Sequence, residues 1–178
     1  MLTLGIDPGS VTTGWALLKA QGKKVDYVAS GILKFDSKVD FLKRLTQIKS
    51  DIDSLISELS PDEVALESLI FVKSPTALIK LAQTRGIILS AIVEKYENKI
   101  FEYSPNLVKS SAVGHGHADK ESVKKVLDML LGKREYKTHD ESDAVAVALC
   151  HILNRGVATK SSSSARGLSS SLAHKIKG

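Results

Sequence analysis

The sequence is poor in cysteine and has no long apolar run. Its 178 residues include one cysteine, Cys150, within the apolar segment AVAVALCHI. A single cysteine excludes an internal disulfide framework and a zinc site built on several thiolates, and this usage is typical of a reducing cytoplasm. No apolar run approaches the ~18 residues that a membrane span requires, and no basic stretch followed by a long apolar core opens the chain. We therefore expect a soluble, cytoplasmic protein that uses no membrane.

Acidic residues are absent from the C-terminal part of the chain. No aspartate or glutamate follows Asp143, and the five basic residues beyond it account for the net charge of +5. Residues 155–178 also carry the serine runs SSSS and SSS and have little that could pack, which is typical of disorder. The preceding segment is long enough to bury its own core. We predict a folded domain at residues 1–154 and a basic, serine-rich, disordered tail at 155–178.

Apolar periodicity predicts alternating strands and helices in the folded part. The predicted strands are 2–6, 15–19, 25–35, 63–67 and 99–104. The predicted helices are 42–59, 74–96, 104–113, 118–132 and 139–153. The first three strands are joined by links too short for a parallel crossover, whereas later strands are separated by helices. This order predicts an α/β domain with a mixed sheet, antiparallel at first and parallel afterwards.

Acidic residues end two of the predicted apolar strands. Asp7 follows LTLGI and Glu67 ends EVALE, while Asp140 and Asp143 share the first turn of the last helix. Burying an isolated carboxylate costs several kcal/mol unless a cation or hydrogen-bond donors compensate. Strand ends that converge in a mixed sheet can bring these four acids together, and divalent cations would relieve their mutual repulsion.

An oxygen-only ligand set favours Mg²⁺ or Mn²⁺ over zinc. Two such ions, ~4 Å apart, can activate a water and stabilise the leaving oxygen of a phosphoryl displacement. We predict a metal-dependent nuclease whose catalytic residues and metal ligands are Asp7, Glu67, Asp140 and Asp143. Taken singly, each acid also fits a structural role as a turn cap, a helix start or a capping box.

Four segments, read in order, resemble the RuvC Holliday-junction resolvases of bacteria. They are LGIDPGSVTTGWALL, VALESLIFVKSPTALIKLAQTRGI, EYSPNLVKSSAVGHGHADKESVKKVLDMLL and HDESDAVAVALCH, and together they span about residues 1–153. The resemblance implies an RNase H-like fold, with a mixed five-stranded sheet flanked by helices on both faces. It also implies a homodimer that resolves four-way DNA junctions by paired symmetric nicks in homologous recombination and DNA repair. Two Mg²⁺ ions per site, with Mn²⁺ as a substitute, and the branch-migration partners RuvA and RuvB are part of the same expectation.

The resemblance carries over to individual residues. The family's four acidic ligands fall on the acids named above, and two important lysines correspond to Lys109 and Lys120, which we count as catalytic. A lysine near the scissile phosphate would offset charge that develops on the phosphoryl oxygens. The family's base-stacking aromatic position holds Ile70 here, and Phe71 follows it, so either can occupy that position. Some members carry histidine in place of Asp140, so ligation by the adjacent His139 is the alternative.

Several residues are predicted to contact DNA phosphate or bases. They are Phe71, Lys73, Lys80, Arg85, Lys109, His115, His117, Lys120, Lys124 and Lys125. Lysines on helix faces are often simply solvated. The histidines of the loop GHGHADK have no neighbours that would complete a zinc site, which favours contact with phosphate.

Three rival functions fit parts of the sequence. The pattern D-x-G-x-x-x-x-G, from Asp7 to Gly14, also occurs in actin-like ATPases, but these need a second domain and a second phosphate loop. A junction-binding module with structural acids is the non-catalytic alternative. An RNase H-fold nuclease that acts on RNA or on an RNA–DNA hybrid is the chemically closest one.

Overall fold

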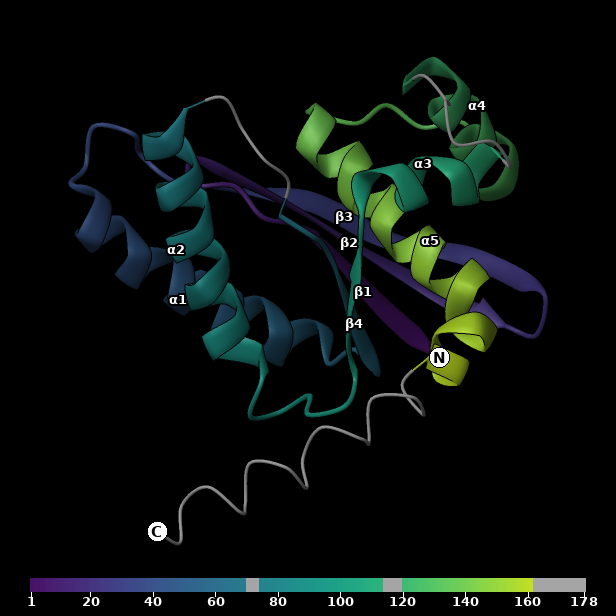
Figure 1. Ribbon diagram of the computed structural model, residues 1–178. Helices are drawn as coiled ribbons and strands as arrows, with labels where there is room; N and C mark the ends of the chain where they lie inside the picture. Colours follow the sequence, from purple (N-terminus) through teal and green to yellow (C-terminus); the bar gives the residue numbers. More distant parts are fainter. Residues whose placement is uncertain (70–73, 114–119, 162–178) are drawn as a thin grey trace, which may run out of the picture.

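The fold is that of a computed structural model, which describes residues 1–69, 74–113 and 120–161, without the side chains of Lys120 and residues 156–161 (Figure 1). The strands are β1 (Leu2–Asp7), β2 (Thr12–Gln21), β3 (Lys24–Lys34), β4 (Glu63–Glu67) and β5 (Ile100–Tyr103). The helices are α1 (Phe41–Leu59), α2 (Pro75–Ile92), α3 (Pro105–Val113), α4 (Lys120–Leu131) and α5 (His139–Ser161).

The five strands form one mixed sheet in the order β3-β2-β1-β4-β5. β1, β2 and β3 pair antiparallel through short turns, whereas β4 pairs parallel with β1 and with β5. The antiparallel-then-parallel order expected from the connection lengths is confirmed. Because β1 and β4 are parallel neighbours, their carboxyl ends lie at the same edge of the sheet.

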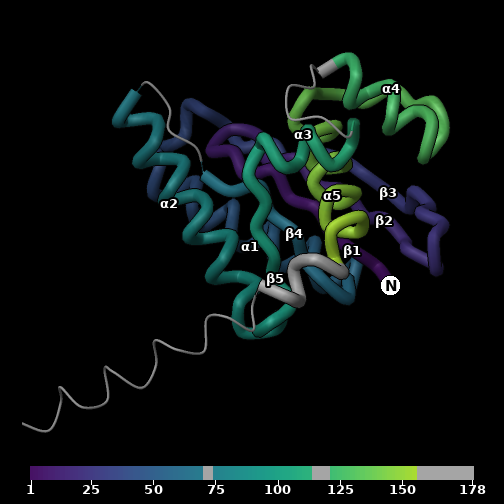
Figure 2. Tube along the Cα trace, turned by 45° about the vertical axis from the view of Figure 1, so that its right-hand side comes forward, coloured from purple at the N-terminus to yellow at the C-terminus, as the bar shows by residue number. Residues whose placement is uncertain are grey.

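Helices cover both faces of the sheet, as Figures 1 and 2 show. One core packs α1 and α2 against residues such as Leu4, Ile6 and Leu66, and the other packs α5, α3 and α4 against residues such as Ala16 and Ala65. Side chains alternate between the faces of a strand. The expected mixed five-stranded sheet with helices on both faces is therefore confirmed.

Glycine lets α5 lie close against the sheet. A Cβ atom at Gly5 of β1 would come within 2.7 Å of the backbone nitrogen of Ala148, and one at Gly14 of β2 would overlap the carbonyl group of Asp140. All seven residues of α5 from Ala144 to Cys150 are buried. The apolar pattern that predicted a buried helix is explained by this close contact.

The helix ends follow local chemistry, with one difference from expectation. The Asp40 side chain accepts from the backbone nitrogens of Leu42 and Lys43 to cap α1, and Gly132, with φ of 82°, follows the end of α4. The apolar spacing predicted that the second long helix runs to residue 96, but α2 ends at Ile92. Tyr96 is nevertheless buried in the same core from a turn, and this is why it continued the apolar pattern.

α5 continues to Ser161, past the predicted domain boundary at residue 154. The residues from 162 onward lie outside the described part of the chain, so the division into domain and tail stays a prediction. None of the helices, as far as the structure describes them, is both long enough and apolar enough to cross a membrane.

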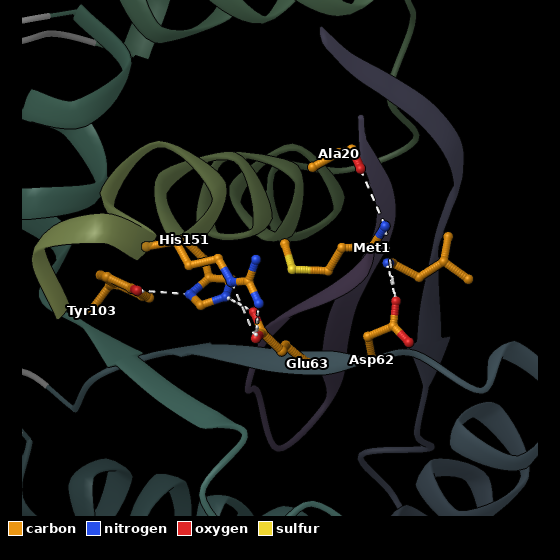
Figure 3. Close-up of polar contacts among 8 residues, drawn as sticks. Met1, Ala20, Asp62, Glu63, Tyr103 and His151 are labelled. Atoms are coloured by element: carbon orange, nitrogen blue, oxygen red, sulfur yellow. Dashed lines mark hydrogen bonds and ion pairs between the residues drawn. The ribbon is translucent and has the colours of Figure 1, made fainter. Parts of the chain in front are cut away.

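A buried polar network fixes α5 against β4 and β5 (Figure 3). The ring of His151, which is fully buried, contacts the Tyr103 hydroxyl through Nδ1 at 2.7 Å and the Glu63 carboxylate through Nε2 at 2.6 Å. Arg155 also donates to Glu63, at 2.7 Å. Burial lowers the pKa of His151, and the opposing effect of Glu63 is smaller, so the ring is neutral near pH 7.

Candidate active site

Two of the predicted acids lie side by side at the carboxyl ends of β1 and β4. Ile6 lies opposite Leu66 in the parallel register, so the next residues along, Asp7 and Glu67, are neighbours. The side chains of Ile6 and Leu66 enter the core under α1 and α2. Because side chains alternate, those of Asp7 and Glu67 point to the opposite face, which α5 covers.

The other three predicted acids all act on the carboxyl group of Asp7. Burial is the largest cause that raises the pKa of Asp7, from 3.8 to about 8, and the charges of Glu67, Asp143 and Asp140 raise it further. A hydrogen bond between the side chains of Asp7 and Glu67 acts in the same direction. The acids that are far apart in the sequence are therefore gathered at one edge of the sheet, with Asp7 as the innermost member.

A glycine next to Asp7 makes this gathering possible. Gly14 pairs with Asp7 across the β1–β2 ladder, and it lies directly beneath the backbone of Asp140 in the first turn of α5. Any side chain at position 14 would push this turn away from the sheet. Asp140 and Asp143 therefore reach Asp7 because Gly14 leaves room for the helix backbone.

The turn that follows Asp7 is held from two sides. The buried Thr13 hydroxyl donates to the carbonyl of Gly9 at 3.0 Å and accepts from the Gly9 nitrogen at 3.3 Å. Arg44 of α1, only 6% exposed, donates to the carbonyl of Ser10 at 2.9 Å. The break PGS after the first strand is thus a fixed turn that directs the chain away from the acids.

Arg85 of α2 holds the backbone at the end of β4. Its guanidinium group donates to the backbone carbonyl of Glu67 at 2.5 Å and forms an ion pair with Glu102 of β5 at 2.7 Å. The side chain is 7% exposed. Arg85 was expected to contact DNA, but the structure places its charge inside, where it fixes the backbone of a predicted metal ligand.

A pocket of about 640 Å³ opens beside the acids, between α3, α4 and the start of α5. Glu67 and Asp143 line one side of it, and Lys109 and Lys124 line it together with the loop before α5. This volume lies within the range of ordinary ligand pockets. The pocket brings lysine side chains and two of the predicted metal ligands to one surface, an arrangement that suits an anionic ligand.

The other predicted site residues fall into three groups. Lys80 is exposed on α2 with its ammonium 5.7 Å from the centre of the Phe41 ring, and Lys125 is exposed on α4. His139 is the exposed first residue of α5 and lines the pocket. Ile70, Phe71, Lys73, His115 and His117 lie outside the described residues, as does the side chain of Lys120.

The donor set fits a hard divalent cation. It consists of four carboxylates without sulfur or obligatory imidazole ligands, and one of them is held partly buried against the others. In the described part of the chain, no group of three or more His, Cys, Asp or Glu side chains has the geometry of a metal site as it stands. The hydrogen bond between Asp7 and Glu67 occupies oxygens that a cation would take.

Sequence reasoning missed residues that support the acids. Thr13, Arg44 and Glu141 have no periodic or motif signal of their own. Arg44 and Glu141 reach partners 34 and 111 positions away in the sequence. A signal was available for Gly14, since a glycine inside a strand pattern often marks the close approach of another backbone.

Comparisons with known proteins agree with one another. A sequence model of one family, described as "Crossover junction endodeoxyribonuclease RuvC", matches residues 3–151. The protein of that name from Agrobacterium fabrum is 37% identical over 153 residues, which cover 86% of this chain and 89% of that protein. The one from Bartonella henselae is 38% identical over 152 residues, covering 85% and 89%. The structure of T. thermophilus RuvC in complex with a Holliday junction substrate matches with a TM-score of 0.81 at 27% identity, over 89% of this chain and 97% of that chain.

Proposed function

The chain belongs to the RuvC family of crossover junction endodeoxyribonucleases, and on this basis we propose that its four acids cut the strands of a four-way DNA junction with the help of divalent metal ions. The RNase H-like fold expected from the sequence is confirmed by the likeness to T. thermophilus RuvC. The protein is a nuclease that resolves Holliday junctions. The observation that carries the metal-dependent mechanism is the geometry that places Asp7 beside Glu67 at the ends of β1 and β4, under the first turn of α5 at Gly14.

Asp7, Glu67, Asp140 and Asp143 are the residues that would hold the ions, which we propose to be two Mg²⁺ per site. Such ions supply activation of a water nucleophile and stabilisation of the leaving oxygen in an in-line displacement. The protein's own contribution is to hold four anionic groups together against their repulsion. It does so with two strand ends, the close approach of α5 at Gly14 and the hydrogen bonds of Arg85 to Glu67.

Lys109 and Lys124 are proposed to hold the DNA backbone over the acids. Both line the pocket that Glu67 and Asp143 border. Lys109 is half-buried, which suits a fixed contact with the scissile phosphate, whereas Lys124 is exposed. A positive group that is already in place when charge develops on the phosphoryl oxygens lowers the barrier of the reaction. Lys120, Phe71, Lys73, His115 and His117 remain predicted DNA contacts.

A homodimer is part of the proposal. Two strands of a junction with near two-fold symmetry must be cut, and each chain provides one acid cluster. Cooperation with RuvA and RuvB, and action in the cytoplasm, belong to the same proposal because they follow from family membership.

The proposal is tested by mapping the cuts on three labelled substrates. The protein is incubated with Mg²⁺ and a four-way junction, a linear duplex or an RNA–DNA hybrid. Paired symmetric nicks confined to the junction are expected. Cutting of the hybrid in preference to the junction would support the RNA-directed rival, and cutting of all three substrates would contradict junction specificity.

A second measurement separates a nuclease from a binding module. Junction binding in the absence of metal is compared for the wild type and the Asp7→Asn variant by gel shift, alongside cutting. A nuclease should keep binding and lose cutting in this variant. Normal cutting by the variant would refute the catalytic role of Asp7.

A further inference from the structure

One acid in the first turn of α5 does not belong to the catalytic set. Glu141 lies between Asp140 and Asp143 in the sequence, yet it is only 5% exposed and is absent from the causes that raise the pKa of Asp7. A buried carboxylate is costly unless hydrogen-bond donors compensate for lost water. The environment of Glu141 must therefore supply such donors.

Both oxygens of the Glu141 carboxylate accept a hydrogen bond from outside the helix. Oε1 accepts from the Ser30 hydroxyl of β3 at 2.6 Å, and Oε2 accepts from the backbone nitrogen of Lys137 at 2.7 Å. The first contact joins residues that are 111 positions apart, and the second fixes the loop that leads into α5. Glu141 therefore ties the start of α5 both to the sheet and to its own entry loop.

The Ser30 end of this contact is itself held in place. The Ser30 hydroxyl lies 2.9 Å from the Tyr27 hydroxyl, and because Ser30 donates its own proton to Glu141, Tyr27 is the donor between these two. The Arg134 guanidinium group lies 3.8 Å from the centre of the Tyr27 ring, on the face of the aromatic ring. Ser30 is thus part of a connected group and not a loose surface hydroxyl.

The Glu141 side chain leaves the helix in a different direction from those of Asp140 and Asp143. Successive residues of an α-helix are about 100° apart around the axis, so Asp140 and Asp143 are separated by about 60°. Glu141 is about 100° from Asp140 and about 160° from Asp143 by the same geometry. It therefore extends towards β3, while the two catalytic acids extend towards β1 and β4 on the other side of the helix.

We propose that Glu141, held by Ser30, is a positioning residue that sets the rotation of the first turn of α5 and so directs Asp140 and Asp143 at Asp7. Gly14 fixes the distance of this turn from the sheet, but glycine offers no side chain that could orient it. The hydrogen bonds of Glu141 supply a directional contact at this turn. The inference rests on the proposed function, since it concerns the same four acids.

The test uses two substitutions that break the contact from opposite ends, Glu141→Met, which keeps the length of the side chain without its acceptor oxygens, and Ser30→Ala. Ser30→Thr keeps a hydroxyl and serves as the conservative rescue, and Glu135→Gln removes a charge from an exposed glutamate in the neighbouring loop as the matched control. For each protein, kcat for junction cutting, junction affinity without metal, and Mn²⁺ binding by calorimetry are measured well below the unfolding temperature.

Both breaking substitutions should lower kcat and Mn²⁺ affinity by roughly 10-fold or more, the range typical when a group that orients metal ligands is lost. Junction affinity should stay within about twofold of the wild type, because the lysines are untouched. Ser30→Thr and Glu135→Gln should behave like the wild type. The double variant should be no worse than the single variant at Glu141, since Ser30→Ala removes one of the two contacts that this variant already lacks.

A folded Glu141→Met variant with wild-type kcat and Mn²⁺ affinity would overturn the inference, as would a loss confined to thermal stability. If that variant does not fold, Ser30→Ala decides the question by the same two measurements. Failure of the proposed function has a different signature, namely a wild-type protein that cuts no junction. The Mn²⁺ titrations would still show whether Glu141 positions the acids.

Discussion

Replacing Asp7 by asparagine should abolish cutting and, without metal, make the folded protein more stable near neutral pH. The pKa of Asp7 is raised from 3.8 to about 8, chiefly by burial and then by the neighbouring acids. Asparagine has nearly the same shape, carries no charge and can still form a hydrogen bond with Glu67. It should therefore relieve the repulsion that the wild type accepts in order to gather four acids.

The size of the effect depends on pH in a defined direction. Below pH 3.8 the carboxyl group is protonated in both the folded and the unfolded chain, so the substitution should change little. Between pH 3.8 and about 8 the unfolded chain releases the proton first, and the wild type loses about 1.4 kcal/mol of stability per pH unit from this group. At pH 7 the upper limit is about 4 kcal/mol, and above pH 8 the difference becomes constant.

The assay is urea unfolding of the metal-free wild type and variant at pH 4, 5.5 and 7. With a urea m-value of about 1–3 kcal/mol/M, a change of 1 kcal/mol shifts the unfolding midpoint by about 0.3–1 M, so a quarter of the upper limit is measurable. Glu58→Gln, on the exposed surface of α1, is the control and should show no such trend. An asparagine variant that is less stable at pH 7, or equally shifted at pH 4 and pH 7, would show that Asp7 is a structural cap and refute the reasoning.

Three further predictions concern the packing of α5, the lysine in the pocket and the buried His151. Gly14→Ala should lower the free energy of unfolding by about 1–3 kcal/mol and reduce cutting, because the new methyl group meets the Asp140 carbonyl. Gly86→Ala has open space around it and should raise the free energy of unfolding slightly. Urea unfolding of both variants measures these changes. Lys109→Met should lower kcat for junction cutting by about 10²-fold with a smaller effect on junction affinity, and equal losses in both would assign it to binding alone. The folded protein should lose stability as the pH falls below 6.5, because His151 has a lowered pKa and the unfolded chain takes up its proton first. In melting curves, a His151→Gln variant should lack this part of the pH dependence. An unchanged pH dependence of the melting temperature would contradict the prediction.

Local patterns in the sequence predicted most of the fold. The strand at 63–67 has the predicted bounds, and Gly132 follows the fourth helix as expected. Apolar periodicity and turn residues are patterns that extend over a few positions, so they can be recognised without the tertiary structure. The same patterns located Asp7 and Glu67, because an acid at the end of an apolar strand contrasts with what precedes it.

Long-range contacts explain what the sequence alone did not disclose. Arg85 lies on a helix with other basic residues and was expected to face DNA, but its guanidinium group is largely buried and contacts the Glu67 carbonyl and the Glu102 carboxylate. Glu141 looks like one more acid in an acidic turn, yet its partner Ser30 lies 111 positions earlier in the sequence. No local pattern distinguishes a charge used inside the protein from one on its surface.

By itself, the sequence determined which residues we propose to carry the chemistry: four carboxylates placed where strands end and where the last helix begins. Only the tertiary structure decided how these carboxylates are aimed, through the parallel register of β1 and β4, the bare backbone at Gly14 and the hydrogen bonds of Arg85 and Glu141. The physical reason is that side-chain type is a local property, whereas direction and distance between groups depend on backbone packing across the whole sheet.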